Sequence, residues 1–226
     1  LYVRIDRTRK VPITTFLRAL GLSSDEDILG LFGENPYIKN SIEKDSTKNT
    51  DEALIEIYEK LRPGEPATLD SAKNQLITRF FDKFRYDLAK VGRYKLNRKL
   101  NVLDRLIGCT LAEDIKDENG NVVASTGTLV TKDVLETVRP IFSNGYNIKE
   151  VMINEELDEY NKVQTVKVYN KKDETKVIEI IGNDPTIDSR RLTISDVYAS
   201  VSYYLDLQEG IGRDDEIDNL SNRRVR

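Results

Sequence analysis

Residues 62–66, with the sequence Arg-Pro-Gly-Glu-Pro, constrain the fold most strongly because no helix can pass through them. Pro63 has no backbone N–H and disfavours a helical conformation at the residue before it. Apolar residues recur at helical spacing on both sides of this segment. They are Ala53, Leu54, Ile57, Tyr58 and Leu61 before it, and Leu69, Ala72, Leu76, Ile77, Phe80 and Phe81 after it. The sequence therefore predicts two amphipathic helices joined by a sharp corner, the second with Thr68 as its N-cap.

The segment that follows the corner is basic, although the whole chain has a net charge of -4. Residues 79–105 contain nine lysines and arginines against three aspartates. Cations neutralise phosphates, and exposed aromatic rings stack on unpaired bases, so this segment favours a polyanionic partner. In the alternative interpretation, Phe80 and Phe81 belong to the core and the cations form a solvated face. Because a free-standing DNA-binding domain is usually basic overall, the pattern fits a module of a larger assembly better.

The composition excludes several classes of function. The chain has no histidine, which removes Ser-His-Asp and Cys-His catalysis and histidine metal sites. Cys109 is the only cysteine, so an internal disulfide is impossible, and this fits a reducing cytoplasm. No apolar run is long enough to span a membrane, and we expect a cytoplasmic protein.

The order of the patterns predicts an α+β fold. Residues 1–101 and 190–226 are expected to form a helical body, and residues 102–189 an inserted β-rich subdomain of short antiparallel hairpins. Asn119-Gly120 is a strong hairpin signal, and residues 164–169 and 176–181 alternate as two strands of a second hairpin. Residues 35–50 are polar, and we expect an irregular, exposed connection there.

An acidic cluster near the end of the chain has two interpretations. Asp214, Asp215, Glu216 and Asp218 could coordinate Mg²⁺, or they could form a solvated turn. Their spacing does not match an EF-hand loop, and the chain has no GxxxxGK[ST] or GxGxxG phosphate-binding loop.

Five segments, in this order and spacing, resemble the bacterial DNA-directed RNA polymerase β subunit, with a Gram-positive-like character. They are RIDRTRK at 4–10, FLRALGLSSDEDILGLF at 16–32, IYEKLRPGEPAT at 57–68, FFDKFRYDLAKVGRYKLNR at 80–98 and GIGRDDEIDNLSNRRVR at 210–226. The resemblance covers both ends and the middle of the chain, whereas residues 103–188 match only in general pattern. It identifies the chain as a fragment of the lobe (β2) domain, cut from a longer chain.

The resemblance implies a non-catalytic part of a nucleotidyltransferase that synthesises RNA on a DNA template. The lobe would hold the downstream duplex and the non-template strand, beside sigma factor and together with the β', α and ω subunits. In this family the aspartates that bind the catalytic Mg²⁺ lie on the other large subunit. We therefore expect no cofactor and no metal in this chain. The resemblance to a DNA-bound enzyme also implies association with the nucleoid and no membrane partner.

The resemblance also assigns DNA-binding residues. Arg4, Arg7, Arg9 and Arg62 correspond to positions that line the DNA path, and Arg93, Lys95 and Arg98 lie in the matched basic segment.

A separate site is implied near the end of the chain. Asp218 would accept both donors on the Watson–Crick edge of an unstacked guanine, beside Ile217 and with Arg223 close. After the acid this chain has Asn219-Leu220-Ser221, where the family more often has His-Leu-Gly.

Two other functions stay open. The β-rich subdomain could be a protein-interaction module that docks a transcription factor through its exposed hairpins. The acidic cluster at residues 214–218 could instead belong to a small metal-dependent phosphoesterase.

Overall fold

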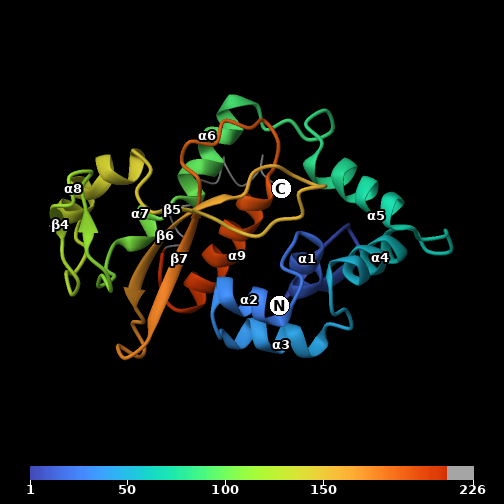
Figure 1. The fold of residues 1–226 in the computed structure, drawn as a ribbon, viewed down its shortest axis with the longest axis horizontal. Coiled ribbons are helices and arrows are strands. Elements are labelled where there is room, and N and C mark those ends of the chain that lie inside the picture. Colours follow the sequence, from blue (N-terminus) through green and yellow to red (C-terminus); the bar gives the residue numbers. More distant parts are fainter. Residues whose placement is uncertain (213–226) are drawn as a thin grey trace. The chain divides into compact units, whose positions relative to one another are not determined.

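The computed structural model describes residues 1–212, which form two compact units (Figure 1). Unit 1 comprises residues 1–87, 152–161 and 191–194, and unit 2 comprises residues 88–151, 162–190 and the described residues from 195 onward. Helices and short antiparallel sheets make up both units, so the predicted α+β class is confirmed. No helix within residues 1–212 is long and apolar enough to cross a membrane.

Unit 1 is mainly helical. Its elements are β1 (Tyr2–Arg4), β2 (Lys10–Pro12), α1 (Ile13–Ala19), α2 (Asp25–Phe32), α3 (Pro36–Lys44), α4 (Thr50–Leu61), α5 (Leu69–Leu76) and the π-helical turn η1 (Ile77–Phe81). Strands β1 and β2 form an antiparallel hairpin that runs directly into α1. Every residue of α1 is buried, and α1 packs against α3 and α4. Helix α1 is therefore the central element of this unit.

The corner predicted at residues 62–66 is confirmed. Helix α4 ends at Leu61, and Gly64 adopts a positive φ of 82°, which a residue with a side chain rarely adopts. Helix α5 then begins after Thr68, whose hydroxyl accepts a hydrogen bond from the Ser71 backbone N–H at 3.2 Å. The Ser71 hydroxyl accepts one from the Thr68 N–H at 3.1 Å, so both ends of a capping box are present.

The expectation of an irregular connection at residues 35–50 is wrong, because these residues include α3. The Asn35 side chain accepts a hydrogen bond from the Tyr37 N–H at 2.8 Å, and Pro36 occupies the first turn. These are two standard signals of a helix start. Ile38 and Ser41 are buried one turn apart. The polar composition hid a helix that buries only a narrow stripe.

Unit 2 combines helices with two small sheets. Its elements are α6 (Ala89–Leu100), α7 (Leu103–Leu106), β3 (Ile115–Lys116), β4 (Val122–Ala124), α8 (Lys132–Ser143), β5 (Ile148–Glu150), β6 (Lys162–Tyr169), β7 (Val177–Asn183) and, except for its first residue, α9 (Ile194–Gln208). The Asn119-Gly120 turn joins β3 to β4, and β6 pairs with β7, so both predicted hairpins are confirmed. The larger sheet has the order β5-β6-β7.

The boundaries of the two units differ from the predicted domain boundaries. That division put residues 1–101 with 190–226 and set residues 102–189 apart, whereas α6 and α9 lie in unit 2 with the β-rich residues. Two buried ion pairs hold α6 and α7 to α9 within unit 2. Arg93 of α6 binds Asp196 of α9 through two contacts of 2.9 Å, and Arg105 of α7 binds Asp206 of α9 at 2.9 Å. How the chain divides into independently folding domains stays a prediction.

The first testable prediction concerns the pair in α6 and α9. Asp196→Ala should lower the free energy of unfolding by about 3–5 kcal/mol, because it leaves the Arg93 guanidinium buried without its carboxylate. Urea unfolding of the chain measures this loss. The control is Glu136→Ala, which breaks the exposed pair of Glu136 with Arg139 and should cost less than about 1 kcal/mol. Equal losses in both variants would contradict the structural role of the buried pair.

Candidate nucleic-acid interface

The loop between β1 and β2 carries three of the arginines predicted to bind DNA. The Asp6 carboxylate accepts hydrogen bonds from the backbone N–H groups of Thr8 and Arg9, each at 2.8 Å. The Ile5 N–H donates to the Arg9 carbonyl at 3.0 Å and closes the loop. Arg4 and Arg7 are exposed, and the Arg4 guanidinium donates to the Arg7 carbonyl at 3.2 Å. The backbone of this arginine loop, residues 4–9, is thus fixed by its own acid.

The same hydrogen bonds change the titration of the acid. The Thr8 backbone N–H is the main cause that lowers the pKa of Asp6, and the Arg9 N–H and the guanidinium groups of Arg9 and Arg79 lower it further against a partial desolvation. Asp6 therefore stays ionised and keeps the loop in its conformation.

Two arginines join the arginine loop to the helices beside it. Arg9 donates to the carbonyl of Leu61, the last residue of α4, at 2.9 Å. This contact places a cation at the negative end of the helix dipole. Arg79, from η1, donates to the Ile5 carbonyl at 2.9 Å. The loop is therefore fixed to both helical segments that flank the corner.

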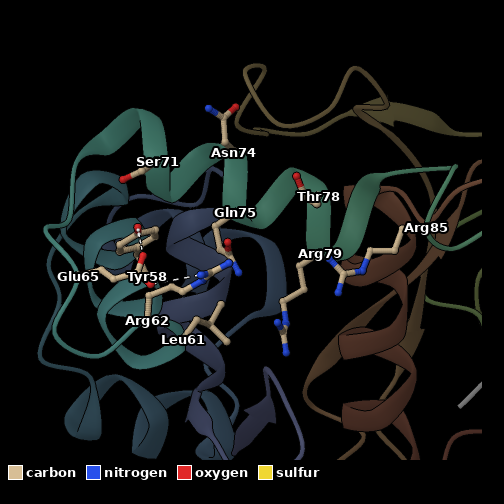
Figure 2. A pocket seen from close by; sticks show the side chains of 10 residues that line it. All are labelled: Tyr58, Leu61, Arg62, Glu65, Ser71, Asn74, Gln75, Thr78, Arg79 and Arg85. Carbon is tan, nitrogen blue, oxygen red and sulfur yellow. Dashed lines mark hydrogen bonds and ion pairs between the residues drawn. The ribbon is translucent and has the colours of Figure 1, made fainter.

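A groove of about 800 Å³ lies between the end of α4, the corner and the polar side of α5 and η1 (Figure 2). The polar side of α5 and η1 consists of Ser71, Asn74, Gln75 and Thr78, which recur at helical spacing and line the groove. Opposite them lie Tyr58 and Leu61 of α4. Because Leu61 and Arg79 line the groove and bind the arginine loop, the loop borders the groove.

The charge of the groove is positive. Arg62, Arg79 and Arg85 line it against one acid, Glu65. Arg62 binds Glu65 at 3.2 Å, yet its side chain is 51% exposed and keeps donors for a ligand. Guanidinium groups and neutral amide and hydroxyl groups are the usual partners of a phosphodiester backbone. The site can therefore bind a phosphate-bearing polymer.

Comparison with known proteins gives the family of the chain. Residues 1–112 match the family model described as RNA polymerase Rpb2, domain 2. Over its whole length the chain is 50% identical to the DNA-directed RNA polymerase subunit beta of Geobacillus thermodenitrificans, 47% identical to that of Listeria welshimeri and 48% identical to that of Streptococcus gordonii. The chain belongs to the RNA polymerase β-subunit family. It spans 19–20% of the length of these relatives.

The predicted resemblance to Gram-positive-type β subunits is thereby confirmed. Of the β-subunit positions carried over to this chain, Arg4, Arg7, Arg9 and Arg62 come together in unit 1, around the corner and the arginine loop. They stay predicted DNA ligands, and their proximity is compatible with one continuous basic surface.

The three predicted DNA ligands on α6, Arg93, Lys95 and Arg98, differ in their exposure. Arg93 is 3% exposed, because its guanidinium binds Asp196 and donates to the Ser189 carbonyl at 2.6 Å. We therefore correct its assignment, since a guanidinium held inside unit 2 does not face DNA. Lys95 is half-buried and Arg98 is exposed, so these two stay predicted ligands.

Three further predicted residues, Ile217, Asp218 and Arg223, lie outside the described residues, as does the acidic cluster at 214–218. Within residues 1–212 no three histidine, cysteine, aspartate or glutamate side chains are grouped so that they could hold a metal ion.

The sequence placed Arg79 and Arg85 in the basic segment but did not identify them as individual DNA ligands, and it did not indicate the polar side of α5 as part of a site. A signal was present, because Ser71, Asn74, Gln75 and Thr78 recur with the same helical period as the apolar residues. The apolar half of that pattern predicts the buried face of the helix, and the polar half indicates the face that lines the groove.

The second prediction concerns Asp6. Because its pKa is lower in the folded chain than in the unfolded chain, the carboxylate stabilises the loop above the unfolded pKa, and this contribution is lost as the pH falls through the folded pKa. In an NMR titration, the Asp6 carboxyl and the Thr8 and Arg9 amides should shift together at a pH below the usual range for aspartate. In Asp6→Ala both amide shifts should lose this pH dependence. An Asp6 that titrates above its usual range would contradict the loop geometry.

Proposed function

We propose that this chain is a non-catalytic lobe module of an RNA polymerase β subunit, which holds downstream duplex DNA and the non-template strand while the whole enzyme synthesises RNA. One observation carries the proposal. In a chain with a net charge of -4, the arginine loop and the groove gather Arg4, Arg7, Arg62, Arg79 and Arg85 in one unit. The identity to β subunits over the whole chain supports the same function.

Under this proposal the arginines contact phosphates and therefore hold DNA of any sequence. Phosphate contacts fix the register and orientation of a nucleic acid without reading its bases. A fixed loop and a groove of defined shape lower the entropic cost of each contact, because little of the protein is ordered on binding. The exposed Arg98 and the half-buried Lys95 of α6 would add contacts to the same partner.

The chemistry would come from the rest of the enzyme. We propose that the catalytic Mg²⁺ is held by the other large subunit and that this chain binds DNA without a cofactor, within an assembly that contains the β', α and ω subunits and sigma factor. A chain that offers positioning and charge, but no histidine, suits this division of labour.

A docking role for the β-rich residues of unit 2 is the second candidate, favoured by exposed apolar side chains. Val122 of β4 and Leu129 are 50% and 55% exposed. If a transcription factor binds there, Val122→Asp with Leu129→Asp should abolish its binding to the polymerase and leave DNA affinity unchanged. A loss of DNA affinity alone would instead assign this surface to DNA.

The third prediction tests the phosphate contacts. In the assembled polymerase, Arg7→Ala and Arg62→Ala should weaken DNA binding equally for unrelated sequences. Each should reduce the slope of log K against log salt by about 1, since each removes one phosphate contact. Arg139→Ala is the matched control, because the Arg139 side chain is 43% exposed and pairs with Glu136 of its own helix. Salt slopes that stay unchanged in both test variants would refute the proposed DNA surface.

The fourth prediction concerns Asp218. If its carboxylate accepts both donors of an unpaired guanine, Asp218→Ala should reduce the preference for guanine at one non-template position by about 5- to 100-fold. Asp214→Ala, in the same acidic cluster, serves as the control and should keep the preference. Competition binding with bubble DNA that differs at single positions measures both. An undiminished preference in Asp218→Ala would remove Asp218 from this role.

A further inference from the structure

The aromatic residues of the basic segment fall into two groups. Phe81 is 3% exposed, and the Phe80 ring lies 5.4 Å from that of Phe16, so these two side chains belong to the core of unit 1. Phe84 is 89% exposed and Tyr86 is 53% exposed. The interpretation of the segment's aromatic residues as core therefore holds for Phe80 and Phe81 but leaves Phe84 unexplained.

Phe84 is held outward by an ordered turn. The Asp82 carboxylate accepts a hydrogen bond from the Phe84 N–H at 2.8 Å. The Asp82 carbonyl accepts from the N–H groups of Arg85 and Tyr86, at 3.2 and 3.0 Å. These hydrogen bonds order the backbone of the turn, residues 82–86. A large apolar ring that is almost fully exposed on an ordered turn is typical of a contact surface.

The surroundings of the ring are cationic. The Lys83 ammonium lies 5.1 Å from the centre of the Phe84 ring, and the Arg85 guanidinium lies 5.9 Å from the centre of the Tyr86 ring. Arg85 also lines the groove together with Arg62 and Arg79. Figure 2 shows Arg85 and Arg79 on the same part of that groove. An exposed ring thus adjoins the arginines of the groove.

We propose that Phe84 is a stacking platform for an unpaired base of a single nucleic-acid strand whose phosphates follow the groove arginines. The inference rests on the proposed function and specifies which residues engage the unpaired strand. A cationic groove beside an exposed aromatic ring is the arrangement with which proteins bind single strands without sequence preference. In duplex DNA the faces of the bases are already stacked on one another, so the ring selects an unpaired strand.

The flanking residues favour this ligand over a protein. A protein that buried Phe84 would also have to cover Lys83 and Arg85, whose charges match a polyanion. Because stacking uses the face that every base has, Phe84 contributes affinity for single-stranded DNA without reading the sequence.

The test uses the full-length β subunit that contains this chain, assembled into polymerase. Bubble DNA carries 5-iodouracil at single positions of the non-template strand, and ultraviolet light cross-links this base to an adjacent aromatic ring. We expect a cross-link that maps to Phe84 at one or two neighbouring positions. Phe84→Ala should abolish it and weaken binding of preformed bubble DNA by about 5- to 100-fold, with little change for fully paired DNA. Phe84→Trp should retain both signals.

Phe84→Leu separates stacking from apolar contact, because leucine keeps apolar bulk without a ring. It should behave like the alanine variant, and full binding by Phe84→Leu would overturn the proposal. Tyr37→Ala removes an exposed ring on α3 and should leave the cross-link and the DNA affinity unchanged.

If Phe84→Ala binds DNA normally while Arg7→Ala weakens DNA binding, the stacking role fails and the proposed function stands. If Arg7→Ala also binds normally, the proposed function fails as well. A Phe84→Ala variant that loses a protein partner and keeps its DNA affinity would likewise overturn the inference.

Discussion

The buried guanidinium of Arg18 is the interaction on which unit 1 depends. Its side chain is completely buried in α1, and it donates to the Asp45 carboxylate at 3.1 Å and to the Ser23 carbonyl at 2.7 Å, and it also pairs with Asp25. Burial opposes the ionisation of Asp45, but hydrogen bonds from Thr47, Thr14 and Thr15 together outweigh it and lower the pKa of Asp45, so this carboxylate stays ionised. Removing one partner of such a pair leaves an uncompensated charge inside. The contacts therefore set the positions of α1, α2 and the end of α3.

This constraint reaches the candidate interface through chain continuity. Strand β2 runs into α1 without a break, so a fixed α1 also fixes the hairpin that carries the arginine loop. Arg9 and Arg79 then tie that loop to α4 and η1. Arg9 and Arg79 thus also support the loop, on which Arg4 and Arg7 are exposed. Positive charge alone does not make a binding residue here, because its partners within the fold decide whether it reaches solvent.

The same distinction explains what could be predicted from the sequence. The corner, its Thr68 cap and the two β-hairpins follow from local signals such as Pro63, Asn119-Gly120 and period-two alternation. The burial of Arg93 has no local signal, since Asp196 lies 103 residues further along the chain. Phe84 differs from Phe80 and Phe81 only because the helical pattern ends before it, at a position that periodicity locates poorly. Tertiary contacts, and not residue type, separate the structural cations from those that face solvent.

Helix α4 adds an electrostatic reason why a polyanion would use one side of unit 1. A second groove along α4 is lined by Asp51, Glu52, Glu56 and Glu59, and the cation that lines it, Lys60, is bound to Glu56 at 3.1 Å. The end of the same helix, at Leu61 and Arg62, borders the basic groove. Helix α4 therefore separates an acidic groove, which repels a polyanion, from the basic groove, which attracts it. Fields of opposite sign orient a charged ligand during approach and suppress wrong placements. The acidic net charge of the chain is thus compatible with a nucleic-acid partner, because the acids confine that partner to the arginine side.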